Sequence, residues 1–100
     1  MPKFNMTIGH NLSQDEALAR IKGLLGEVKT EFADKVSNLK EDWSGNRGIF
    51  SFSAMGFNVS GVITVHESGV DLAGKFPFAA LPFKGKIEAT IRERAEKLLG

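Results

Sequence analysis

The strongest constraint on the fold is a set of short alternating segments between residues 39 and 74. Apolar and polar residues alternate there with a period of two, in four segments separated by turn residues at 44–46, 55–56 and 67–69. Such alternation predicts β-strands that bury one face and leave the other in water. Because the turns are short, the four segments predict an antiparallel meander.

An amphipathic segment precedes the meander. Ser13 and Glu16 match the capping-box pattern of a helix start. Apolar residues then recur every three or four positions, which predicts one long helix over about residues 14–37. Gly23 and Gly26 lie inside it, and each costs about 1 kcal/mol of helix stability relative to alanine.

Two further elements complete the expected order. Residues 3–8 alternate and predict a strand before the first helix, and apolar spacing of three or four predicts a second helix over about residues 82–99. The chain is therefore expected to form a single α+β domain over residues 1–100, in the order strand, helix, four strands, helix. One antiparallel sheet would carry both helices on one face, either as a curved helix-grip-like domain or as a flatter layered sheet.

Composition excludes several classes of protein. Hydrophobic residues make up 42% and charged residues 25% of the 100 residues, as in ordinary globular domains. Cysteine is absent and the net charge is +1, so neither disulfides nor a strong field for nucleic acid is expected. No stretch approaches the roughly 18 apolar residues of a membrane span, and no signal-peptide core is recognisable, so we expect a cytoplasmic protein.

Residues suited to catalysis are scarce. His10 and His66 are the only histidines and lack the spacing of metal ligands. We interpret His10 as a capping or solvent-exposed loop residue, and His66 as a strand-end residue beside Glu67. Adjacent acids point in different directions on a helix or a strand, and no phosphate-binding loop is present. The sequence therefore predicts a protein that is not an enzyme and needs no cofactor or metal.

An apolar cluster bordered by lysines follows the meander. Residues 75–100 carry six basic and three acidic residues, but the segment lacks the aromatic interleaving and the arginine stripe of nucleic-acid binders. An exposed apolar patch usually marks a partner surface, whereas the alternative is that all three phenylalanines of the cluster lie in the core. The candidate binding residues are Phe76, Phe78, Leu81, Phe83, Lys84 and Lys86.

Parts of the chain resemble the polyhydroxyalkanoic acid system proteins. The resemblance rests on Gly-Val-Asp-Leu at 69–72, on Phe78, on Leu-Pro-Phe-Lys-Gly-Lys-Ile-Glu at 81–88 and on Ile91. The segment His-Asn-Leu-Ser at 10–13, followed by Glu-Ala at 16–17, resembles the helix entry of the same family. The resemblance implies a cytoplasmic bacterial protein associated with polyhydroxyalkanoate granules or their regulation. It implies no catalytic residues.

Pattern and resemblance together give one hypothesis and two alternatives. The chain would be a non-enzymatic accessory protein whose apolar cluster contacts the polyester surface or a granule protein. Its lysines would meet polymer carboxylate ends or acidic partners. One alternative is a small-ligand carrier whose cavity is lined by Trp43, Phe50, Phe52 and Ile91. The other is a self-associating module that forms a homodimer through the same patch.

Overall fold

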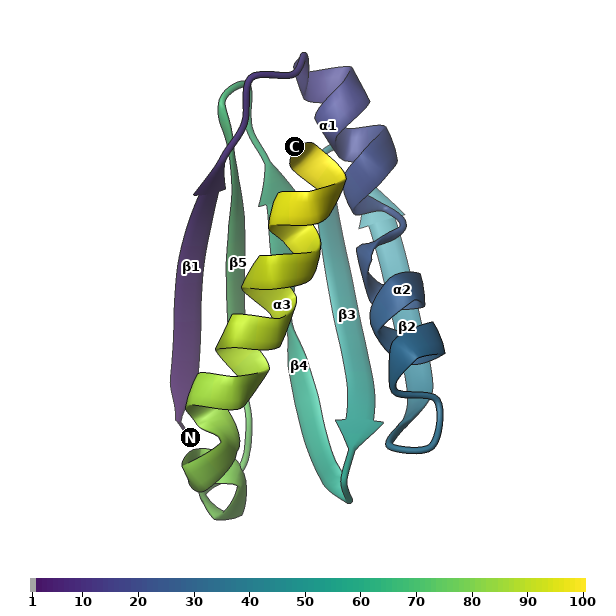
Figure 1. The fold of residues 1–100 in the computed structure, drawn as a ribbon, viewed down its shortest axis with the longest axis vertical. Helices are drawn as coiled ribbons and strands as arrows, with labels where there is room; N and C mark the ends of the chain where they lie inside the picture. The colour runs from purple at the N-terminus through teal and green to yellow at the C-terminus, as the bar shows by residue number, and fades with distance from the viewer. Residues whose placement is uncertain (1) are drawn as a thin grey trace.

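The computed structural model describes residues 2–100 as a five-stranded antiparallel sheet with its helices on one face (Figure 1). Along the sheet the strand order is β1-β5-β4-β3-β2. The α+β class and the single antiparallel sheet are therefore confirmed. The elements are β1 (Lys3–Gly9), α1 (Gln14–Ile21), α2 (Leu24–Glu31), β2 (Val36–Ser44), β3 (Arg47–Ala54), β4 (Phe57–Val65), β5 (Gly69–Lys75), the 3₁₀ helix η1 (Phe78–Phe83) and α3 (Lys84–Leu99).

The meander forms where the alternation predicts it. Phe50 and Phe52 of β3 are buried on the covered face, whereas Ile49 of the same strand is exposed on the open face. Strand β1 pairs antiparallel with β5, the last strand of the meander. The first strand therefore lies beside the segment that leads into η1 and α3.

The predicted long helix over residues 14–37 is wrong, and with it the predicted element order. The structure has two helices, α1 and α2, separated at Lys22 and Gly23. The Gly23 amide donates to the Arg20 carbonyl three residues back, which tightens the chain out of the α-helical pattern. Glycine makes this break inexpensive, because it contributes the least to helix stability apart from proline.

The end of the predicted helix is also wrong. Helix α2 ends at Glu31, and Val36 already lies in β2, where it pairs with Ala54. Asn38 has a φ of 56°, and the register between β2 and β3 shifts between Ser37 and Lys40, which is a β-bulge. Val36 is thus buried as a strand residue, although its spacing also fits the helical stripe.

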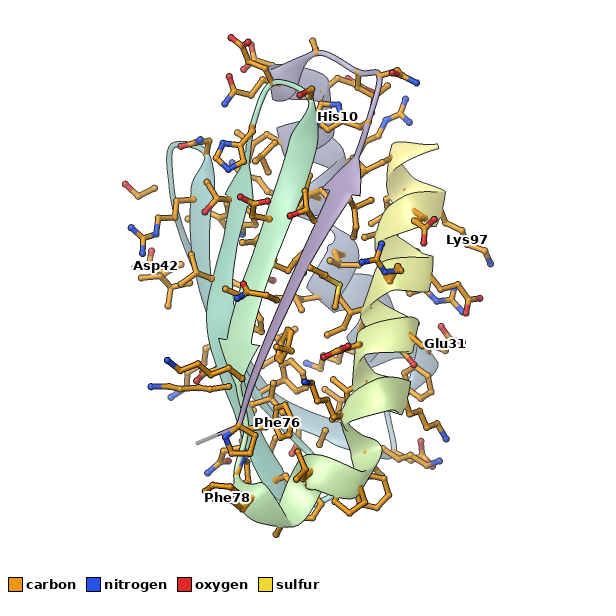
Figure 2. The ribbon with its side chains drawn as sticks, turned by 90° about the vertical axis from the view of Figure 1, so that its left-hand side faces the viewer. His10, Glu31, Asp42, Phe76, Phe78 and Lys97 are labelled. Atoms are coloured by element: carbon orange, nitrogen blue, oxygen red, sulfur yellow. The ribbon has the colours of Figure 1, made fainter. Side chains whose placement is uncertain are left out.

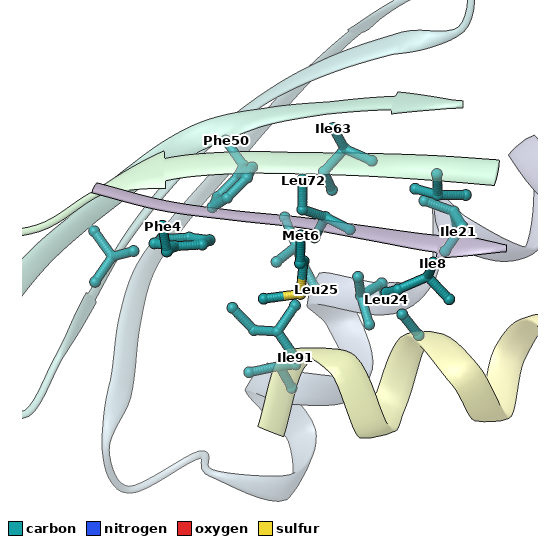
Figure 3. Packing of buried hydrophobic residues seen from close by; sticks show 14 of the residues in the cluster. Phe4, Met6, Ile8, Ile21, Leu24, Leu25, Phe50, Ile63, Leu72 and Ile91 are labelled. Atoms are coloured by element: carbon teal, nitrogen blue, oxygen red, sulfur yellow. The ribbon is translucent and has the colours of Figure 1, made fainter. Parts of the chain in front are cut away.

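The three helices share the covering of the sheet. Helix α3 lies diagonally across the covered face and packs against β1, α1 and α2. Figure 3 shows the space beneath it filled by side chains such as Met6, Leu72 and Ile91. Phe50, Phe52 and Ile91, predicted to line a carrier cavity, are buried members of this packed core, and Trp43 packs at its margin.

Aromatic side chains lie over glycines of neighbouring strands. Phe4 pairs with Gly74, and Phe50 pairs with Gly61, while the two glycines face each other across β4 and β5. A Cβ at Gly61 would lie 2.3 Å from the Ala73 carbonyl oxygen and 2.8 Å from the Phe50 ring. Only glycine fits there, so the aromatic–glycine pairs fix the strand register as well as filling the core.

His10 joins two loops at the end of the sheet opposite η1. Its Nδ1 accepts a hydrogen bond from the Leu12 amide at 3.1 Å, and its Nε2 lies 3.1 Å from the His66 carbonyl oxygen. The residue is 9% exposed. The solvent-exposed interpretation of His10 is therefore wrong, because the fold packs the loop before α1 onto the turn between β4 and β5. His10 does not cap α1 either, since the N-cap is Ser13, which accepts from the Glu16 amide.

Candidate functional site

Exposed hydrophobic side chains gather at one end of the molecule. Among residues 2–100, five large hydrophobic residues are exposed, and four of them lie on η1 or on the turn between β3 and β4. Figure 1 shows these two segments at the same end of the ribbon. We call this surface the apolar end, and its members are Met55 (46% exposed), Phe78 (72%), Leu81 (47%) and Phe83 (38%).

The structure corrects one predicted binding residue. Phe76 has no exposed surface and stacks on Phe4, with ring centroids 6.2 Å apart. Its amide donates to the Pro2 carbonyl, so the β1–β5 pairing continues past Lys75. Phe76 therefore belongs to the core, whereas Phe78, only two residues later, projects at the apolar end (Figure 2).

The other predicted residues follow one another into α3. Leu81 and Phe83 end the 3₁₀ turn, and the Phe83 ring lies 6.0 Å from the Phe57 ring of β4. Lys84 reaches Glu88 at 3.7 Å, and Lys86 lines a groove beside Phe83. The structure thus brings together all the candidate binding residues except Phe76.

The apolar end continues into a groove between α2 and α3. Its floor is formed by Val36 at the start of β2 and by Phe52 and Ala54 at the end of β3. The cavity volume is about 90 Å³. Pockets for drug-sized ligands measure roughly 300–1,000 Å³, so this groove is too small for the sizeable ligand of the carrier alternative. The lining residues are Val28, Phe32, Lys35, Val36, Phe52, Ala54, Met55, Phe83, Lys86, Ile87, Thr90 and Ile91.

Specific contacts hold the walls of the groove in place. The Met55 amide donates to the Lys35 carbonyl at 3.0 Å, which joins the loop after α2 to the β3–β4 turn. Arg94 of α3 forms an ion pair with Glu31 of α2, one turn beyond the groove-lining residues of α3. No sequence pattern marks Lys35 or Met55 as a site residue, because only the pairing of β2 with β3 brings them to the apolar end.

A polar cluster lies on the open face of the sheet, away from the apolar end. The Thr7 hydroxyl donates to Asp71 Oδ1 at 2.8 Å, and His66 Nε2 lies 2.9 Å from Asp71 Oδ2. The Thr7 hydrogen bond and then the His66 contact lower the pKa of Asp71 below its ordinary value of 3.8. The partner of His66 is thus Asp71 rather than Glu67, and the cluster is an exposed network that links β1 to β5.

This network predicts an effect of substituting Thr7. A lowered carboxyl pKa stabilises the folded state above pH 3.8, and that contribution disappears as the pH falls through the lowered value. Thr7→Val removes the donor, so we expect the pKa of Asp71 to rise toward 3.8 in an NMR titration. Thr64 faces Asp71 from β4, and no hydrogen bond joins the two side chains. An equal rise in Thr64→Val would contradict the assignment.

Residues 2–100 offer little support for other kinds of site. No group of three His, Asp or Glu side chains there is placed to hold a metal ion. None of the helices in the same residues is both long and apolar enough to cross a membrane. We take the apolar end and its groove as the candidate site because exposed apolar side chains lie there beside an apolar-lined groove.

Comparison with protein families identifies the relatives of this domain. The model of the family described as "Putative polyhydroxyalkanoic acid system protein (PHA_gran_rgn)" matches residues 5–99. The chain belongs to this family. The match spans the sheet, α1, α2, η1 and α3 almost entirely, so the residues of the apolar end and of the groove lie within the matched region.

The polyhydroxyalkanoic acid system protein was also compared with curated proteins and with solved structures. No curated protein matches the chain. Among solved structures, the crystal structure of TTHA0849 from Thermus thermophilus is similar at 13% sequence identity and a TM-score of 0.38. The match covers 98% of this chain and 92% of that one.

Proposed function

We propose that this protein is a non-enzymatic accessory protein that attaches to the polyester surface of polyhydroxyalkanoate granules through its apolar end. The family links the chain to the polyhydroxyalkanoate system. The single observation that carries the binding part is the exposure of Phe78, Leu81 and Phe83 together, beside Met55. The proposal places the protein in the cytoplasm, at the granule surface.

The chemistry of the surface fits that of the polymer. Polyhydroxyalkanoates are aliphatic esters, so a granule presents apolar groups and carries charge only at chain ends. An apolar side chain that moves from water onto such a surface is stabilised by about 25 cal/mol per Å² of apolar area buried. Lys84 and Lys86 border the apolar end, where a lysine stem covers apolar surface while its ammonium group stays in water.

The alternatives predict different occupants of the same surface. A granule protein or a second copy of this chain would also cover Phe78 and Leu81, because burial of exposed apolar area drives both kinds of association. We favour the polymer because the members of the apolar end are all apolar side chains, and the bordering lysines can keep their ammonium groups in water. Light scattering of the free protein separates the homodimer from the monomer.

Co-sedimentation with polyester particles tests the proposal. We expect the purified protein to pellet with particles of polyhydroxybutyrate at low salt and to remain bound in about 1 M salt, where the Debye length is about 3 Å. Apolar contact survives such screening. Binding that disappears with salt would assign the attachment to the lysines instead, and absence of binding at every salt concentration would contradict attachment to the polymer.

A further inference from the structure

The groove beside the apolar end combines an apolar lining with hydrogen-bond donors. Of its lining side chains, nine are apolar, and the remaining three are Lys35, Thr90 and Lys86. All three can donate hydrogen bonds, and no carboxylate of residues 2–100 lines the groove. Such a site is complementary to an anion that carries a short apolar group.

Both lysines are available to a ligand. Across residues 2–100, neither Lys35 nor Lys86 takes part in an ion pair, whereas Lys84 reaches Glu88 and Arg94 binds Glu31. Lys35 comes from the loop after α2, and Lys86 comes from the first turn of α3, so the two lysines line the groove from different elements. The Lys35 backbone is held by the Met55 amide, which fixes its position next to the groove.

The size of the groove limits the apolar group. A volume of about 90 Å³ is well below the roughly 300–1,000 Å³ of pockets that hold drug-sized ligands. The short alkyl branch of one hydroxyalkanoate unit is of this size. A long acyl chain is not.

We propose that this groove binds the carboxylate-terminated end of a polyester chain. The alkyl branch of the last unit occupies the apolar part, and the carboxylate meets Lys35 and Lys86. The inference rests on the proposed function for the identity of the polymer. Met55, Phe83 and Lys86 belong to both surfaces, and Lys35 and Thr90 belong to the groove alone. Phe78 and Leu81 contact the polymer surface, whereas Lys35, Lys86 and Thr90 recognise where a chain ends.

Binding of a soluble oligomer tests this inference. The probe is a linear tetramer of 3-hydroxybutyrate, with its terminal carboxylate either free or capped as a methyl ester, titrated into the folded protein by NMR or calorimetry. We expect the free acid to bind about tenfold more tightly than the ester, because a hydrogen bond from an ammonium group to a charged carboxylate is stronger than one to a neutral ester. We also expect the preference for the acid to weaken with salt.

Matched variants assign the effect to the groove. Lys35→Gln and Lys86→Gln should each remove most of the preference for the acid. Lys97→Gln, which changes an exposed lysine near the far end of the same helix (Figure 2), should leave it unchanged. Ala54→Leu places a larger side chain in the groove and should weaken binding of acid and ester alike, with melting temperatures recorded for every variant.

The outcomes separate this inference from the proposed function. Equal affinity for acid and ester, or equal loss in Lys97→Gln, overturns chain-end recognition while particle binding can still stand. If free 3-hydroxybutyrate binds more tightly than the tetramer, the ligand of the groove is a small soluble acid, and the claim that it binds the end of a polyester chain is overturned. If the protein prefers the acid but does not bind particles, the proposed attachment to the granule surface is wrong, whereas recognition of the carboxylate by the groove stands.

Discussion

Replacing Phe78 and Leu81 together by serine is expected to lower the affinity for polyester particles about 100-fold. Phe78 is 72% and Leu81 47% exposed, so both offer apolar surface that a particle can cover. Burying one such side chain completely contributes about 1.5–3 kcal/mol to binding. Each of the two contributes less than this, because part of its surface is already covered in the free protein. Co-sedimentation over a range of particle concentrations measures the change.

A matched control comes from the open face of the sheet. Ile49 is 58% exposed but lies on β3, away from the apolar end, so Ile49→Ser removes a similar apolar side chain elsewhere. We expect its particle affinity to match the wild type, and we expect all the variants to keep the wild-type melting temperature. If Ile49→Ser loses as much affinity as the double variant, binding is non-specific hydrophobic adsorption and does not depend on the apolar end.

Gly61→Ala is expected to produce the largest loss of stability among the glycine-to-alanine substitutions in this chain. The new Cβ would lie 2.3 Å from the Ala73 carbonyl oxygen and 2.9 Å from the Gly74 Cα, and both atoms belong to the neighbouring backbone. Backbone cannot yield as a flexible side chain can, so we expect a cost of about 3 kcal/mol. For a domain of this size that lowers the melting temperature by on the order of 15 °C.

Another glycine provides the comparison. At Gly26, inside α2, an added Cβ meets no atom within 4 Å. Gly26→Ala should therefore raise stability by about 1 kcal/mol, because alanine favours the helix. Thermal denaturation followed by circular dichroism measures both variants. A Gly61→Ala domain that melts close to the wild-type temperature would show that the aromatic–glycine pairing is not as tight as the structure has it.

The strands were predictable because burial repeats along them. In β3 and β4 the alternation decides the face of each residue, and the structure places Phe50 inside and Ile49 outside accordingly. The end of the first helix was harder to predict from the sequence, because Val36 fits both the apolar stripe of a helix and the alternation of a strand. Its pairing with Ala54 decides the matter, and that contact lies eighteen positions along the chain, beyond the reach of local periodicity.

The candidate site was predictable in part for the same reason. The alternation of β5 extends through Val70, Leu72 and Gly74 to Phe76, which was the signal that Phe76 points inward. Pro77 then ends the pairing, and Phe78 leaves the sheet. Lys35 could not be predicted, because only the pairing of β2 with β3 brings it to the site, and the hydrogen bond between its carbonyl and the Met55 amide extends that pairing.

A dye at the apolar end tests the central claim most directly. The chain contains no cysteine, so one introduced cysteine can be labelled selectively with a fluorophore that reports the polarity around it. Ala79→Cys places the dye on η1, where residue 79 is exposed, and Lys97→Cys places it on an exposed position near the far end of α3. Each labelled protein is mixed with polyhydroxybutyrate particles, and its emission is compared with that of the free protein.

Attachment through the apolar end predicts a blue-shifted emission for the dye at position 79 and an unchanged emission for the dye at position 97. The shift should remain at high salt, because it reports burial against an apolar surface. Equal shifts at both positions, or a shift at position 97 alone, would contradict the claim that Phe78, Leu81 and Phe83 form the surface that meets the granule.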